Sequence, residues 1–355
     1  MSSLFNFARA TLPPHCIATS FAPDLEIHTS NRSIADELQG RSLHIPSLSS
    51  ILAPLAAGTT PGFDELKHRI NSRLDAIVEC PVMRKKVDAI DLPLQMSRWY
   101  PYSSLDNQEL LALYNLWLFV WDDVFDGEDA QEIQPADMGS IFEETMDYVK
   151  FHLGLADSPE EPQAPTPATA LFQHAGKLIK ERCDLEQRQR FFREVEFYVL
   201  SCAHEHKTIA SGILPSLQHY WEYRLGTTSV YTGCALADLM AGVRLPWELI
   251  DTEEMQIIWT EVNLNVIIVN DILSLKKEMH GSVHSLLPIF MNETGKDMDA
   301  AAADIINRLR FSVENFTATS QKLFAMVGQD KELQESLAKY LELLEYNMTG
   351  NYTWR

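Results

Sequence analysis

The sequence predicts an all-α protein built around one large helical domain. Apolar residues recur with helical periodicity from residue 62 onward, and strand patterns are scarce. The 355 residues are 46 % hydrophobic and include only 15 glycines, which favours one large core over several small ones. We expect residues 1–60 to form an arm, partly irregular, and residues 61–355 to form a single domain.

The expected arm is rich in proline, serine and threonine, for example in Pro13-Pro14, Ser47–Ser50 and Thr59-Thr60-Pro61. Such composition is typical of extended chain, with one short helix near Ile34–Leu38. Residues Met1–Ala10 carry too little charge and too short an apolar core for a signal peptide.

Helices should fill much of residues 62–154. The proline-rich stretch Asp157–Pro167 then predicts a loop. It is expected to connect helices within one domain, because polar motifs that must meet lie on both sides of it. Helical periodicity resumes at Ala168 and covers Leu185–Ala203, Leu236–Met240 and Met298–Tyr346.

The segment Leu110–Trp121 is apolar almost all round, which predicts a helix buried inside a bundle. It should begin at Ser103 or Ser104 and end at Gly127. Its far end carries an acidic cluster in which Asp122 and Asp126 are four residues apart, so both carboxylates leave the same helical face.

A second polar cluster ends another apolar helix, which Gly281 should close. There Asn270, Ser274 and Glu278 follow each other at intervals of four residues and again share one face. All these groups offer oxygen, and the set contains no Cys or His. Oxygen ligands suit Mg²⁺, which normally shares its coordination with substrate phosphates. The two clusters predict one metal-diphosphate site with five metal ligands: Asp122, Asp126, Asn270, Ser274 and Glu278.

The two clusters, in this order and about 150 residues apart, resemble the aspartate-rich motif and the Asn-Asp-x-x-Ser-x-x-x-Glu motif of class I terpene cyclases. The resemblance spans residues 90–355, and Arg98-Trp99-Tyr100-Pro101 is similar to fungal sesquiterpene and diterpene cyclases. It implies a class I terpenoid synthase helical bundle with a central apolar active-site cavity. It also implies three Mg²⁺ ions and an isoprenyl diphosphate substrate.

Arg224 lies 46 residues before Asn270 (270 − 224), where the family places an arginine that senses the diphosphate. A guanidinium fork suits phosphate oxygens. The resemblance implies that Thr227 and Thr228 act with it at a helix break, and Leu225–Gly233 is a poor helix interior. It further implies that Lys277 adds positive charge at the diphosphate.

Ionisation of such a substrate leaves a cation that needs a dry, aromatic cavity. Phe119 lies three residues before Asp122 on the same face, and Trp354 is a second candidate for contact with the substrate. Asn115 is polar in an apolar helix, and either a hydrogen bond in the core or contact with the substrate would explain it. Further aromatic candidates are Trp99, Tyr100, Trp221, Tyr223 and Trp259. Asp123 and Asp271 are expected to be partners of the ligands or weaker ligands.

Asn351–Trp354 resembles the start of the family's closing segment, whose Arg-Tyr pair does not follow within these 355 residues. We expect the given sequence to stop short of that pair, and the alternative is that Arg355 stands in for it.

Farnesyl diphosphate is the favoured substrate, and geranylgeranyl diphosphate remains an alternative. A chain-elongating isoprenyl diphosphate synthase is less favoured, because such enzymes carry two aspartate-rich motifs and here the second position reads Asn270-Asp271-x-x-Ser274. A non-enzymatic isoprenoid-binding helical protein is the remaining alternative.

Composition limits the partners. A net charge of −21 argues against binding nucleic acid. No stretch of membrane-spanning length is expected, and a homodimer is left open. The five cysteines are Cys16, Cys80, Cys183, Cys202 and Cys234. Their odd number and wide spacing predict reduced, mostly buried thiols and a cytoplasmic protein.

Overall fold

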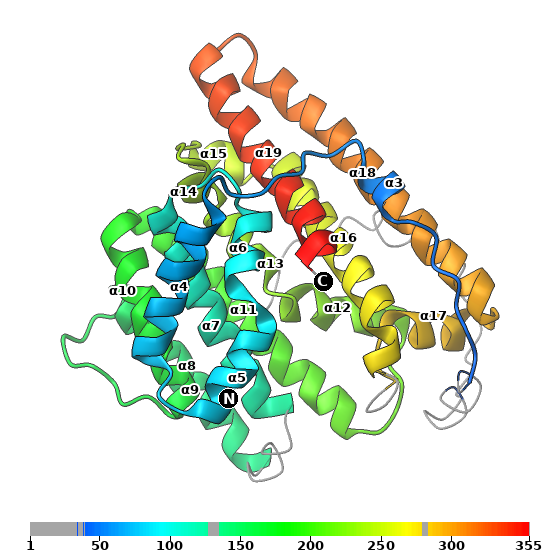
Figure 1. Ribbon diagram of the computed structural model, residues 1–355, viewed down its shortest axis with the longest axis horizontal. Helices are drawn as coiled ribbons and strands as arrows, with labels where there is room; N and C mark the ends of the chain where they lie inside the picture. The colour runs from blue at the N-terminus through cyan, green and yellow to red at the C-terminus, as the bar shows by residue number, and fades with distance from the viewer. Residues whose placement is uncertain (1–33, 35–37, 39, 127–134, 279–282, 355) are drawn as a thin grey trace.

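The regular secondary structure of the described part of the chain is helical, with no strand, which confirms the all-α prediction (Figure 1). The computed structural model describes residues 34, 38, 40–126, 135–278 and 283–354, and within helices it leaves out the side chains of residues 125, 126, 135–138, 277 and 278. The helices are α3 (Ser49–Leu52), α4 (Phe63–Ile77), α5 (Pro81–Ile90), α6 (Leu92–Trp99), α7 (Leu105–Asp126), α8 (Pro135–His152), α9 (Pro167–Ala170), α10 (Phe172–Arg182), α11 (Leu185–Ala210), α12 (Leu217–Thr227), α13 (Val230–Ala235), α14 (Ala237–Ala241), α15 (Trp247–Ile250), α16 (Glu253–Glu278), α17 (Leu286–Thr294), α18 (Met298–Val327) and α19 (Lys331–Trp354).

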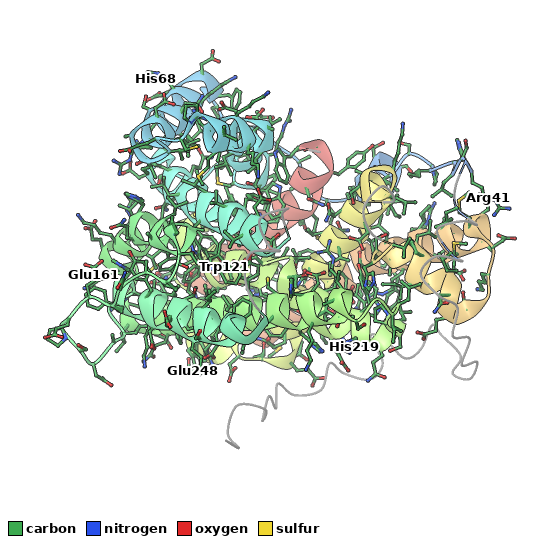
Figure 2. All side chains as sticks on the ribbon, turned by 90° about the horizontal axis from the view of Figure 1, so that it is seen from below. Arg41, His68, Trp121, Glu161, His219 and Glu248 are labelled. Carbon is green, nitrogen blue, oxygen red and sulfur yellow. The ribbon has the colours of Figure 1, made fainter. Side chains whose placement is uncertain are left out.

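Helix α7 lies in the interior, as its sequence predicts. Ser104 caps it, since its hydroxyl accepts the backbone N–H of Asn107 at 3.2 Å. Trp117 and Trp121 are fully buried, and Figure 2 shows Trp121 well inside the body of the molecule. The expected stop at Gly127 lies outside the described residues.

Helix α16 is the second core helix. Residues 261–269 are buried without interruption. Its segment Glu253–Lys276 is long and apolar enough to cross a membrane by length and composition, contrary to our expectation that no such stretch exists. Of the 18-residue window in this segment that is apolar enough, 78 % is buried inside the protein. The segment therefore packs against other parts of the same chain. The expected stop at Gly281 lies outside the described residues.

Two predicted stretches can be compared with the structure. The loop predicted around Asp157–Pro167 lies between α8 and α9. The stretch Met298–Tyr346, which has helical periodicity, is divided into α18 and α19, because the chain turns at Gly328, whose φ of 67° lies in the left-handed region that favours glycine. Figure 1 shows α18 and α19 as a long pair along one side of the bundle.

The last part of the expected arm packs on the helical body. Leu48, Ile51 and Leu52 are buried. The backbone N–H of Ala56 donates to Glu345 of α19 at 2.8 Å. The short helix expected near residues 34–38 and the residues before it lie largely outside the described part. Residues 48–60 therefore pack on the helical body through some of their side chains, while others, such as Ser49, Ser50 and Ala53, are exposed.

Candidate active site

One face of α7 opens onto accessible space. Between residues 108 and 122 the partly exposed side chains are Asn115, Phe119 and Asp122, whereas the other residues of this stretch are buried. The spacings of four and three residues place all three on one face. This face is where the predicted substrate cavity should lie.

Two residues of α11 contact the carboxylate of Asp122. The buried hydroxyl of Tyr198 donates to Oδ1 at 3.3 Å, and the thiol of Cys202 lies 3.8 Å from the same oxygen. Burial and the nearby charge of Asp122 raise the pKa of Tyr198 well above its ordinary value, so the phenol stays a donor at neutral pH. The sequence alone carried no sign of this contact, because the residues are 76 positions apart.

The second motif presents an oxygen that lacks a partner. Oδ1 of Asn270 is buried and accepts no hydrogen bond among the described groups. A buried amide oxygen without a donor costs free energy, which a cation would recover. Oxygen donors at Asp122 and Asn270 therefore fit Mg²⁺. Ser274 lies one turn on and donates to the backbone oxygen of Asn270 at 2.7 Å.

Three predicted site residues cannot be placed by their contacts. The side chains of Asp126, Lys277 and Glu278 lie outside the described residues. Their assignments as two metal ligands and a diphosphate contact stay predictions.

The break between α12 and α13 lies where the sequence predicts it. Ser229 has a φ of 57°, and its hydroxyl is 3.1 Å from that of Tyr114 in α7. On the other side, Thr228 donates to Oδ1 of Asn263 in α16 at 2.6 Å, and Asn263 in turn donates to the backbone oxygen of Leu225 at 2.7 Å. The break is therefore held between α7 and α16.

The break gives a common reference point from which the position of each motif along its helix can be measured. Asp122 lies eight residues beyond Tyr114 (122 − 114), and Asn270 lies seven residues beyond Asn263 (270 − 263). At 1.5 Å per residue, both lie roughly 10–12 Å past the shared break. Figure 1 shows α7 and α16 both descending from the region of α14 and α15. Each motif therefore lies about the same distance along its own helix from the residue that contacts the break.

Arg224 is fixed by an ion pair with the second motif. Its Nη2 donates to Oδ1 of Asp271 at 2.7 Å, and its Nη1 donates to Thr227 at 3.3 Å. Asp271 also accepts from the hydroxyl of Tyr220 and from the backbone N–H of Leu286 at 3.1 Å. Burial acts to lower the pKa of Arg224, but the charges of Asp271, Tyr220 and Glu205 and the hydrogen bond to Asp271 together outweigh it and raise that pKa well above its ordinary value. The guanidinium therefore stays charged.

Phe119 and Trp354 form a partly exposed aromatic pair, with ring centroids 6.2 Å apart. The indole of Trp354 donates to the backbone oxygen of Ile90 at 2.8 Å, which fixes the end of α19 beside α5. Trp99 meets Trp354 edge to face at 6.5 Å. Phe119 and Trp354 are both partly exposed, so these two rings are our candidates for contact with a substrate.

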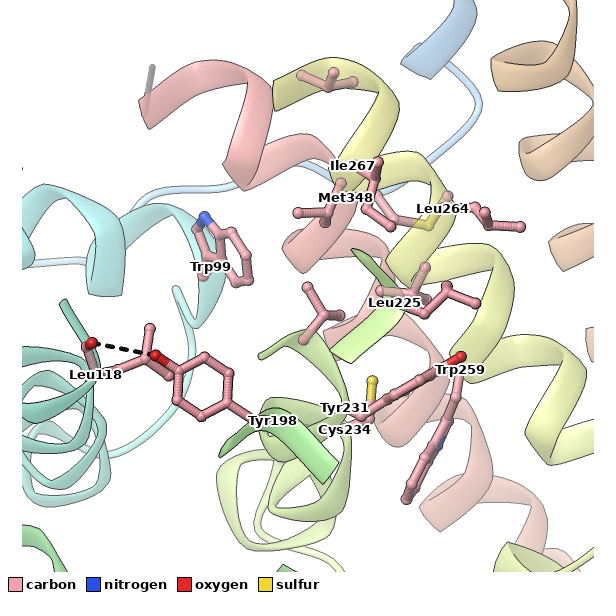
Figure 3. Close-up of a cluster of buried hydrophobic side chains, with 14 of the residues drawn as sticks. Trp99, Leu118, Tyr198, Leu225, Tyr231, Cys234, Trp259, Leu264, Ile267 and Met348 are labelled. Carbon is pink, nitrogen blue, oxygen red and sulfur yellow. Dashed lines mark hydrogen bonds between the residues drawn. The ribbon is translucent and has the colours of Figure 1, made fainter. Parts of the chain in front are cut away.

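The remaining aromatic candidates are core residues in the structure. Trp259 is fully buried and donates to the hydroxyl of Tyr340 at 2.8 Å, while Tyr100, Trp221 and Tyr223 are also buried. Figure 3 shows Trp99, Tyr198, Tyr231 and Trp259 in one cluster of side chains contributed by several helices.

Asn115 donates to Oε1 of Gln95 in α6 at 3.0 Å. This bond explains the polar side chain in an apolar helix. It agrees with the first of the two predicted explanations, a hydrogen bond in the core. Asn115 is also partly exposed on the stripe with Phe119, so contact with a substrate stays a prediction.

A pocket of about 720 Å³ lies elsewhere, beside the start of α11 and Trp247. None of the predicted site residues lines it. The pocket therefore lies apart from the predicted site residues.

A family model for terpene synthase family 2, C-terminal metal binding, matches residues 114–314, which is more than half of the 355 residues. The chain belongs to the terpene synthase family. It is an enzyme of the terpene synthase type, a lyase, and the description of the matched region implies metal binding.

Curated relatives agree over most of their length. The sesquiterpene cyclase hepA of Aspergillus oryzae is 26 % identical over 319 residues, which cover 87 % of this chain and 86 % of that protein. Pristinol synthase of Streptomyces pristinaespiralis is 25 % identical over 278 residues, covering 75 % of this chain and 72 % of that protein.

Solved structures confirm the fold. Germacradien-4-ol synthase from Streptomyces citricolor has a TM-score of 0.71 at 16 % identity, covering 89 % of this chain and 98 % of that one. Hedycaryol synthase has a TM-score of 0.72 at 17 % identity, covering 88 % and 98 %. The terpene synthase thus has the helical fold of the class I enzymes.

Proposed function

We propose that this terpene synthase is a Mg²⁺-dependent sesquiterpene cyclase that ionises farnesyl diphosphate and cyclises the resulting cation. The observation that carries this proposal is the surroundings of the two motifs. Asp122 is hydrogen-bonded to α11, Arg224 is paired with Asp271, and the neighbouring Asn270 has an amide oxygen without a partner among the described residues. The C15 substrate is supported by relatives that are sesquiterpene cyclases.

The residues have separate roles in this reaction. Asp122 and Asn270, with Asp126, Ser274 and Glu278, would hold the metal ions, and three ions are our proposal. When bound, Mg²⁺ supplies positive charge that stabilises the departing diphosphate. Arg224, joined by Lys277, would donate to the diphosphate oxygens.

The carbon–oxygen bond at C1 breaks, and diphosphate leaves with the electron pair. Thr227 and Thr228, at the helix break beside Arg224, would meet the C1 end of the substrate. The aromatic faces of Phe119 and Trp354 would stabilise the allylic cation and exclude water. Ring closure and loss of a proton then give a cyclic terpene.

Incubation of the purified protein with Mg²⁺ and farnesyl diphosphate, followed by analysis of the organic extract and of released diphosphate, tests this function. A cyclic product supports it, and a control with chelator should give none. A parallel reaction with geranylgeranyl diphosphate decides between C15 and C20 substrates. A longer prenyl diphosphate would instead identify a chain-elongating synthase. The cytoplasmic location and the homodimer stay predictions.

A further inference from the structure

Asp271 is a buried carboxylate that joins three helices. It belongs to α16, it accepts hydrogen bonds from Arg224 and Tyr220 of α12, and it accepts the backbone N–H of Leu286 at the start of α17. Only 2 % of its side chain is exposed. A buried charge is stable only when it is paired and hydrogen-bonded, so these donors explain how Asp271 is tolerated there.

These contacts direct Asp271 away from metal binding. A carboxylate offers about four lone-pair sites, and described donors occupy three of those on Asp271. Its neighbour Asn270 lies about 100° round the helix, and the amide oxygen of Asn270 has no partner among the described groups. Asn270 therefore remains available to bind a metal ion, whereas Asp271 is engaged by donors from α12 and α17.

The same contacts fix Arg224 before any substrate arrives. Asp271 and Thr227 each hold one terminal nitrogen of the guanidinium, which leaves other N–H groups of the fork available. The side chain is 16 % exposed, so part of it remains accessible. A donor that is already held in place loses less conformational entropy when a ligand binds.

We infer that Asp271 is a positioning residue that sets Arg224 for the diphosphate of the substrate. This inference rests on the proposed function. Tyr220 supports Asp271 from the same helix that carries Arg224, one turn earlier. Loss of either support should leave Arg224 charged but poorly aimed.

Two tyrosines of α12 offer a matched test. The hydroxyl of Tyr220 donates to Asp271, whereas the buried hydroxyl of Tyr223, three residues on, has no hydrogen-bond partner within the part of the chain that the structure describes. Tyr220→Phe and Tyr223→Phe remove the same atom from the same helix. We expect Tyr220→Phe to lower kcat about 3- to 10-fold and Tyr223→Phe to change it less than about twofold.

Asp271→Asn removes the charge itself, and we expect about 10- to 100-fold lower kcat with a smaller change in KM. Binding of inorganic diphosphate at saturating Mg²⁺, measured by calorimetry, should weaken by about 10-fold or more in Asp271→Asn and stay unchanged in Tyr223→Phe. Melting temperatures report whether each variant is folded. If Asp271→Asn does not fold, the pair of phenylalanine variants decides.

Equal effects of Tyr220→Phe and Tyr223→Phe on kcat and on diphosphate binding would overturn the inference, as would wild-type diphosphate binding by a folded Asp271→Asn. Failure of the proposed function shows differently, as wild-type protein that releases no diphosphate from any prenyl diphosphate. In that case the calorimetric comparison still decides whether Asp271 positions Arg224 for a diphosphate.

Discussion

At the scale of single residues, neighbours in the aspartate-rich motif have different surroundings. Asp122 is partly buried and accepts from Tyr198 of α11. Asp123 is 60 % exposed, and Nζ of Lys86 lies 3.6 Å from its carboxylate. Exposed pairs of this kind contribute little. The structure therefore separates a partly buried carboxylate, which is our proposed metal ligand, from one on the surface.

Asp122→Asn should lower kcat about 100-fold or more, because it removes the charge of a proposed metal ligand at almost constant shape. Asp123→Asn is the matched control and should keep kcat within about threefold. Steady-state kinetics with farnesyl diphosphate measure both. Full activity in Asp122→Asn would contradict the metal-ligand assignment.

Arg224→Lys should lower kcat by more than it raises KM, because lysine keeps the charge and loses the planar fork that both Asp271 and a diphosphate need. We expect a fall of about 10-fold or more, measured by the same kinetics. Wild-type turnover in both Arg224→Lys and Arg224→Ala would show that this arginine does not contact the diphosphate.

At the scale of elements, the helix break depends on a close approach of α11 and α12. A Cβ built on Gly226 would lie 1.9 Å from Oγ and 2.4 Å from Cβ of Ser201. Gly226 is therefore required for packing, although it lies inside a helix with ordinary dihedral angles. The break that carries Thr227 and Thr228 begins directly after it.

Gly226→Ala would stabilise an isolated helix by about 1 kcal/mol. We expect the opposite here, a destabilisation of about 1–3 kcal/mol from overpacking, together with lower kcat. Thermal denaturation and kinetics measure the two effects. Ser201→Gly should reduce the cost of Gly226→Ala in a double-mutant cycle. Simple additivity of the two changes would contradict the proposed clash.

At the scale of the whole molecule, the proposed site is assembled from helices that are distant in sequence. The first motif ends α7, the arginine ends α12, and the second motif lies on α16. Each element alone presents a polar end of an apolar helix. Metal ions and diphosphate should therefore bind as one set across all three.

We expect Mg²⁺ and inorganic diphosphate together to raise the melting temperature by more than the sum of their separate effects. Each ligand completes the binding site of the other and binds only the folded state. Differential scanning fluorimetry measures the shifts, and Asp122→Asn should lose the excess. Additive shifts in the wild type would count against a shared site.

The sequence by itself determined the fold class and the chemistry of the motifs. Helical periodicity and the apolar run Leu110–Trp121 predicted a buried helix, because burial of such a face dominates local structure. Spacings of four residues placed Asp122 with Asp126, and Asn270 with Ser274, because helix geometry is local. The break after Leu225 was also predictable, from residues with poor helix propensity.

Only the tertiary structure decided which side chains meet across helices. Tyr198 lies beside Asp122, and Asn263 holds Thr228, through contacts that no sequence spacing encodes. Asp271, which was expected to be a partner of the ligands or a weaker ligand, pairs with Arg224. Such pairings depend on how whole helices pack, since that packing is set by many apolar contacts at once and a local pattern records just one side of each.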